Sequence, residues 1–146
     1  MSAAEGRWLD GLMTMECVFP SPPTGDWHGA PGRVLRGPDG AAALNFAPGR
    51  WLLLTNADHW SATATAAGAL LFDTDGKWRV LRLPRAHRAV HAALDLDSTL
   101  EHRDCAAASM FDTPVVIARA SEPDLLLLCI PASYAASFSD SVQAWR

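Results

Sequence analysis

Short apolar segments separated by turn-forming residues occupy most of the chain from Arg33 onward. Glycine and proline interrupt helices and favour tight turns, so this spacing predicts a series of short strands. Asp75-Gly76 is a typical hairpin turn between two of these strands. The predicted strands span residues 34–35, 43–46, 50–55, 69–73, 78–83, 106–111, 114–118 and 125–130.

Three helices are predicted between or after these strands. The first is capped by Asn56 or Asp58 and ends at Gly68. The second begins at Pro84, because proline is tolerated in a first helical turn. The third is capped by Ser133 and buries one apolar face made of Tyr134, Phe138, Val142 and Trp145. Strands interrupted by three helices predict a single α+β domain with an antiparallel or mixed sheet.

Residues 1–32 have a different pattern and predict an N-terminal arm ahead of a domain over residues 33–146. Its apolar residues fall on one face of a helix, and a run rich in proline and glycine follows them over residues 20–32. Such an arm either folds back onto its own core or docks on another chain. An exposed apolar stripe and a tryptophan are typical of a binding surface. The candidate partner-binding residues are therefore Trp8, Leu12, Met15, Phe19 and Trp27.

The overall composition excludes several classes of function. A length of 146 residues provides one domain with a core, and a net charge of -4 without a basic stripe excludes nucleic-acid binding. The longest strongly apolar run, residues 125–130, is too short to span a bilayer, and no secretory signal pattern occurs. The three cysteines are far apart and form no C-x-x-C pair, so reduced thiols in a cytoplasmic protein are expected.

The sequence offers few candidates for chemistry. His87 and His91 have the spacing of two metal ligands on one helix face, but arginines flank them and no third ligand is apparent, so a solvated basic face is favoured. The pairs at 73 and 75 and at 95 and 97 are aspartates in turn contexts, where they hydrogen-bond the local backbone. No nucleophile elbow or phosphate-binding glycine loop occurs. We therefore predict no catalytic, cofactor-binding or metal-binding residue in this chain.

Several segments, in order from about Ala43 to the C-terminus, resemble a known family. Residues 47–54 are similar to the G-P-x-x-W-L signature of folate-binding aminomethyltransferase-like domains, and residues 72–83 resemble the D-x-S-x-x-W-x-x-L-x-L segment of the same domains. Residues 113–117 and 131–135 are similar to a V-P-V-L-L strand and a closing P-R-S-[FY]-A helix. These last two segments occur in the gamma subunits of heterotetrameric sarcosine oxidases, and the chain resembles that family.

The chain also departs from the pattern of this family. Pro84 stands where the family usually has glycine, and Ala132 stands where it has arginine. The K-G-C-x-x-D-L stretch is reduced to residues 92–96, and the K-G-C-Y-x-G-Q-E signature of the related folate-dependent proteins is absent. The order of the matching segments along the chain is the main support for the resemblance.

The resemblance implies an aminomethyltransferase-like fold and a non-catalytic accessory subunit. In the heterotetrameric oxidase, FAD, FMN, NAD and tetrahydrofolate belong to the larger subunits, so none of them is expected in this chain. The implied partners are large flavoprotein subunits that oxidatively demethylate a secondary amine and transfer its one-carbon unit to tetrahydrofolate. The alternative is a free-standing, self-associating protein of the same fold that binds folate or another small molecule. An independent enzyme is the least favoured interpretation.

Overall fold

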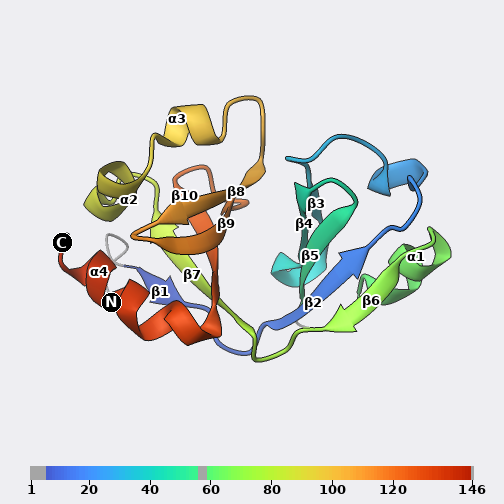
Figure 1. The fold of residues 1–146 in the computed structure, drawn as a ribbon, viewed down its shortest axis with the longest axis horizontal. Coiled ribbons are helices and arrows are strands. Elements are labelled where there is room, and N and C mark those ends of the chain that lie inside the picture. The colour runs from blue at the N-terminus through green and yellow to red at the C-terminus, as the bar shows by residue number, and fades with distance from the viewer. Residues whose placement is uncertain (1–5, 56–58, 146) are drawn as a thin grey trace.

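The computed structural model describes residues 6–55 and 59–145, which form two five-stranded antiparallel sheets packed face to face (Figure 1). Sheet A has the order β1 (Arg7–Trp8), β7 (Trp78–Pro84), β10 (Leu125–Pro131), β9 (Thr113–Arg119) and β8 (Cys105–Met110). Sheet B has the order β3 (Val34–Arg36), β4 (Ala42–Ala47), β5 (Arg50–Thr55), β2 (Met13–Val18) and β6 (Leu70–Asp73). All the strands predicted beyond Arg33 are present.

Helices lie against the outer faces of the two sheets. The α-helices of the described residues are α1 (Ser61–Ala66), α2 (Arg88–Ala93), α3 (Leu96–Thr99) and α4 (Ala135–Gln143). Short 3-10 turns occur as η1 (Gly25–Trp27), η2 (Pro38–Gly40) and η3 (Ala132–Tyr134). The predicted single α+β domain is confirmed, with α3 as a helix that the sequence did not indicate.

Buried side chains of the described residues form three cores. The inter-sheet core lies between the sheets and includes Leu52, Leu54, Val116 and Cys129. The helix-side core lies between sheet A and α2, α3 and α4, and includes Val90, Leu96, Ile117, Leu128 and Phe138. The outer core covers the other face of sheet B with α1 and η1, and includes Cys17, Trp27, Trp51, Leu53 and Trp60. Each sheet is therefore buried on both faces over most of its width.

The prediction of a helix near the N-terminus is wrong, because residues 7–8 form a strand of sheet A and residues 13–18 form a strand of sheet B. In β1, Trp8 pairs with Leu81 at one edge of sheet A. The strand β2 lies inside sheet B, between β5 and β6, so it is hydrogen-bonded on both sides. Backbone pairing of β2 with two neighbouring strands stabilises the extended conformation. A short helix with the same apolar spacing would be only marginally stable by itself. The predicted arm is thus not separate from the domain over the residues that the structure describes.

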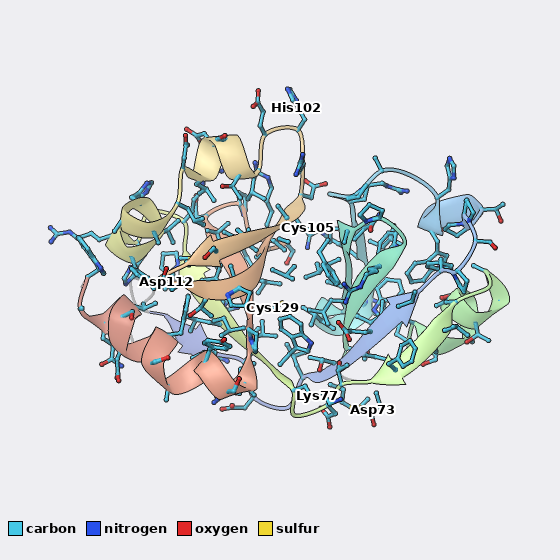
Figure 2. The ribbon with its side chains drawn as sticks, in the orientation of Figure 1. Asp73, Lys77, His102, Cys105, Asp112 and Cys129 are labelled. Carbon is cyan, nitrogen blue, oxygen red and sulfur yellow. The ribbon has the colours of Figure 1, made fainter. Side chains whose placement is uncertain are left out.

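The hairpin predicted at Asp75-Gly76 is also wrong, although the turn itself forms. The Asp75 amide donates to Asp73 Oδ1 at 2.9 Å, and the Lys77 amide donates to the Thr74 carbonyl at 2.8 Å. The strands on either side, however, enter different sheets. Thr14 Oγ1 donates to the Thr74 carbonyl at 2.9 Å and so holds the turn on β2. The segment is a crossover from sheet B to sheet A, and Asp73 and Lys77 lie along it (Figure 2).

The chain passes between the sheets twice at the same end of the molecule. One crossover joins β1 to β2 and the other joins β6 to β7 (Figure 1). A third connection, through hydrogen bonds, is made at Gly32. Its carbonyl accepts the amides of Asp104 at 2.7 Å and Cys105 at 3.1 Å, and its own amide donates to the Asn45 carbonyl at 2.7 Å. Its φ of +109° and the Arg103 side chain close to its Cα favour glycine here.

The predicted helix ends differ in part from those observed. Pro84 is the last residue of β7, and His87, not Pro84, precedes α2. The caps predicted for the first helix, Asn56 and Asp58, lie outside the described residues. In the last helix, Phe138 and Val142 are buried as predicted, whereas the apolar residues near its two ends are 42% and 46% exposed: Tyr134 and Trp145. The buried face is therefore narrower than the sequence indicated.

Candidate functional site

The five candidate partner-binding residues do not share one surface. Trp8 is half-buried against the helix-side core, and Leu12 is half-buried against the inter-sheet core. Met15 packs against the outer core, in which Phe19 and Trp27 are buried. The apolar stripe that motivated the prediction is absent over residues 8–19, all of which the structure describes. Their role in partner binding stays a prediction without that support.

Trp27 owes its burial to an aromatic cluster on the outer face of sheet B. Its ring centroid lies 4.9 Å from that of Trp51, 5.7 Å from that of Phe19 and 5.9 Å from that of Trp60. Tilted and edge-to-face contacts at these distances are favourable beyond simple burial. The turn η1 thus anchors the proline-rich segment onto sheet B, and Trp27 acts as a core residue.

The candidate histidine pair is divided between a structural role and solvent. His87 caps α2, since its Nδ1 accepts a hydrogen bond from the Ala89 amide at 3.0 Å, and burial lowers the pKa of its imidazole. His91 is exposed. Within residues 6–55 and 59–145, no group of three or more histidine, cysteine or acidic side chains is arranged to hold a metal ion. The aspartates were predicted to hydrogen-bond the local backbone. This is confirmed for Asp73 and Asp95, whose carboxylates each accept a hydrogen bond from a nearby backbone amide.

The three cysteines are free thiols in buried positions. Figure 2 places Cys105 and Cys129 between the sheets, where Cys105 Sγ donates to the Asn45 carbonyl at 3.3 Å. Burial, with a smaller effect of the Asp104 carboxylate, raises the pKa of Cys105 to about 12. Burial raises the pKa of Cys17 to about 11 and that of Cys129 well above its usual range.

We expect the three thiols to be unreactive in the folded protein and to destabilise it at high pH. At about pH 8, a thiol reagent should modify the urea-unfolded chain much faster than the native chain, because only the thiolate reacts. Unfolded thiols lose their protons near pH 9.0, whereas the folded Cys17 and Cys105 keep theirs to about pH 11 and 12. The free energy of unfolding should therefore fall as the pH rises above about 9.

Urea titrations at several pH values measure the free energy of unfolding. Its fall with rising pH should be smaller in the Cys17→Ala variant, because one buried thiol has been removed. Equal modification rates in the folded and unfolded chains would contradict the burial of the thiols.

The strand β6 carries the most exposed large apolar side chains that the structure describes. Leu70 is 53% exposed and Phe72 is 50% exposed. Both project from one face of β6, opposite Val18 and Glu16 of β2. Glu16 in turn lies opposite Leu52, whose side chain is in the inter-sheet core. Leu70 and Phe72 therefore lie on the inner face of sheet B, and their exposure means that sheet A does not cover them.

The edge at β6 has few of the features that usually block edge-to-edge association, apart from its length of four residues and the charge of Asp73. Among the strands that the structure describes, β6 pairs with β2 alone. Its sequence, Leu70-Leu71-Phe72-Asp73, has no proline or lysine, and its register with β2 shows no bulge. Edge strands without such protection are suited to pairing with another chain. We refer to Leu70, Phe72 and the open edge of β6 as the β6 surface.

Sequence reasoning missed the β6 surface. The apolar run over residues 69–72 predicted a strand but not an edge, and a run with apolar residues on both faces is more typical of a buried strand. The exposure follows from the crossover at Asp73–Lys77, which sends the next strand into sheet A and leaves β6 without a second neighbour. No local sequence signal indicates that event.

The arrangement of the two sheets matches a solved structure. A chain of the heterotetrameric sarcosine oxidase from Corynebacterium sp. U-96, in complex with pyrrole 2-carboxylate, aligns with a TM-score of 0.70. The alignment covers 96% of this chain and 84% of that chain, with 18% sequence identity. The two chains share a fold. No protein-family model and no curated protein sequence matches this chain.

The shared fold supports the resemblance at the level of architecture. In addition, no helix of the described residues is long and apolar enough to cross a membrane. Two features of the described residues are candidates for function. They are the β6 surface and a pocket between the two sheets.

Proposed function

We propose that this chain is a non-catalytic accessory subunit, of the gamma type, in a sarcosine-oxidase-like flavoenzyme. The observation that carries the proposal is the shared fold, over 96% of the chain, with a chain of a heterotetrameric sarcosine oxidase. The ordered sequence similarities between Ala43 and the C-terminus support it independently. In this proposal the larger partner subunits bind FAD, FMN, NAD and tetrahydrofolate, as the resemblance to the gamma subunits implies. This sequence itself contains no phosphate-binding glycine loop.

The β6 surface is the part of the chain that we assign to assembly with a large subunit. Leu70 and Phe72 each retain about half of their accessible surface, so a partner could bury them without disturbing any of the three cores. The open edge of β6 offers unpaired backbone groups to an added strand, a common mode of recognition. Apolar side chains beside such an edge supply binding energy that backbone pairing alone lacks.

The proposal is tested by capturing the tagged chain from its native source. The captured complex should show flavin absorbance and consume oxygen when sarcosine is added. The double variant Leu70→Asp/Phe72→Asp should lose the complex, because truncating an interface hot spot costs about 2 kcal/mol or more, a roughly 30-fold loss of affinity. The matched control is Tyr134→Asp, since Tyr134 is similarly exposed but precedes α4 on the side of sheet A.

Two results separate the parts of this proposal. If the unmodified chain captures no flavoprotein, the accessory-subunit function is wrong. If the double variant captures the flavoprotein as well as Tyr134→Asp does, the function stands and the β6 surface is not the interface.

A further inference from the structure

A pocket of about 190 Å³ lies at one end of the interface between the two sheets. Its apolar lining comes from both sheets and from the β1–β2 crossover, and consists of Leu9, Leu12, Ala42, Leu54 and Leu127. Its charged lining consists of Arg36 at the end of β3, Arg82 in β7 and Glu122 in the turn between β9 and β10. Two arginines from different sheets thus meet a small apolar pocket.

Arg82 is the main reason to expect an anion in this pocket. It is half-buried, and its guanidinium forms no hydrogen bond or ion pair with any residue that the structure describes. In sheet A it lies directly opposite Arg7, so both side chains project from the same face. Like charges directly opposite each other in a sheet repel, and a half-buried charge that no described residue neutralises is unfavourable. A bound anion would relieve both effects.

Arg36 is held in place at the other side of the pocket. Its Nη2 donates to the carbonyls of Arg119 at 2.8 Å and Ala120 at 3.4 Å, across the gap from sheet B to sheet A. A guanidinium has five N–H donors, so this attachment leaves others for a ligand. Arg36 is therefore a preorganised positive group rather than a flexible one.

Glu122 limits the kind of anion that fits. Its Oε2 accepts a hydrogen bond from Ser121 Oγ at 3.2 Å, and it forms no ion pair with an arginine among the described residues. The charged lining of the pocket therefore sums to a single positive charge, with Arg7 adjacent to it. Glu122 would repel a dianion such as phosphate more strongly than a singly charged carboxylate, and one negative charge matches the net charge of the lining. The leucines favour an alkyl group on the same ligand.

We propose that this pocket binds a small aliphatic monocarboxylate. The carboxylate lies between Arg82 and Arg36, which suit its planar, two-oxygen geometry, and the alkyl chain lies on the leucines of the lining. The proposal does not depend on the accessory-subunit function, because every residue that it uses belongs to this chain.

Titration of the full chain with butyrate, followed by amide NMR, tests the proposal. The signals of Gly37, Gly40, Ala41 and Ala42, which line the pocket, should shift and saturate at millimolar ligand. Butyramide, which has the same shape without the charge, should leave these signals in place. Arg82→Gln should weaken butyrate binding about tenfold or more, since a hydrogen bond to a charged group is lost. Arg88→Gln, at an exposed position on α2, should leave it unchanged.

Several outcomes would overturn the assignment. Butyramide shifting the same signals as strongly as butyrate would remove the role of charge, and this comparison needs no variant. Equal butyrate affinity in Arg82→Gln and the unmodified chain would exclude the proposed contact. Tighter binding of inorganic phosphate than of butyrate would exclude a monocarboxylate, and signals that do not saturate would exclude a site.

Discussion

Deletion of residues 1–20 should unfold the chain rather than release a folded domain. The deletion removes β1 and β2, and β2 lies between β5 and β6 in sheet B. It also removes Cys17 and Phe19 from the outer core. A domain has a net stability of only about 5–15 kcal/mol, and each large buried side chain contributes about 1.5–3 kcal/mol before the lost strand pairing is counted. The interactions that remain in residues 21–146 should not be enough to keep the chain folded.

Thermal unfolding followed by circular dichroism measures this effect. The deletion variant should lack the cooperative transition of the full chain, and a synthetic peptide of residues 1–20 added in excess should restore it. A deletion variant that unfolds cooperatively on its own, near the midpoint of the full chain, would show that β1 and β2 are dispensable.

Phe138→Ala should be the most damaging single substitution in α4. Phe138 is 1% exposed in the helix-side core, and its ring contacts that of Phe111 edge to face, with centroids 6.0 Å apart. Truncating a buried phenylalanine costs about 3–5 kcal/mol, partly because a cavity remains. In a chain of this size each kcal/mol lowers the thermal midpoint by about 2–4 °C, so a fall of roughly 6–20 °C is expected.

Tyr134→Ala is the matched control for this substitution, because Tyr134 lies beside the same helix and is largely exposed. Its midpoint should change by no more than about 2 °C, as is usual for surface positions. Similar shifts in the two variants would mean that α4 does not pack on sheet A through Phe138.

Strands could be predicted from the sequence wherever local turn residues bounded them. The strands β3 to β10 were all indicated, because glycine, proline and aspartate mark their ends. These turn residues act locally and do not depend on how the strands later pair. The failures occurred where pairing with distant residues decided the outcome. Residues 8–19 have a helical spacing, yet they become strands because β5 and β6 offer hydrogen-bonding partners on both sides of β2.

The candidate site was even less accessible from the sequence. Leu70 and Phe72 are exposed only because β6 is the last strand of its sheet. Arg36 and Arg82 line one pocket only because the sheets stack, and each alone is an ordinary arginine in a strand. Four of the five residues chosen for the N-terminal arm, Trp8, Leu12, Met15 and Phe19, were in contrast selected on a helical periodicity that the fold does not use.

The two crossovers described above have a consequence for how this chain melts. Sheet B is one continuous stretch of chain, β2 to β6, inserted between β1 and the other strands of sheet A, so completing sheet A requires both passages of the chain to be in position. The hydrogen bonds at Gly32 tie the sheets together as well. Because the two sheets also share the inter-sheet core, we expect neither sheet to act as an independent cooperative unit, although each has a core of its own on its outer face. The chain should behave as one all-or-none element, in which a disturbance of either sheet is felt throughout.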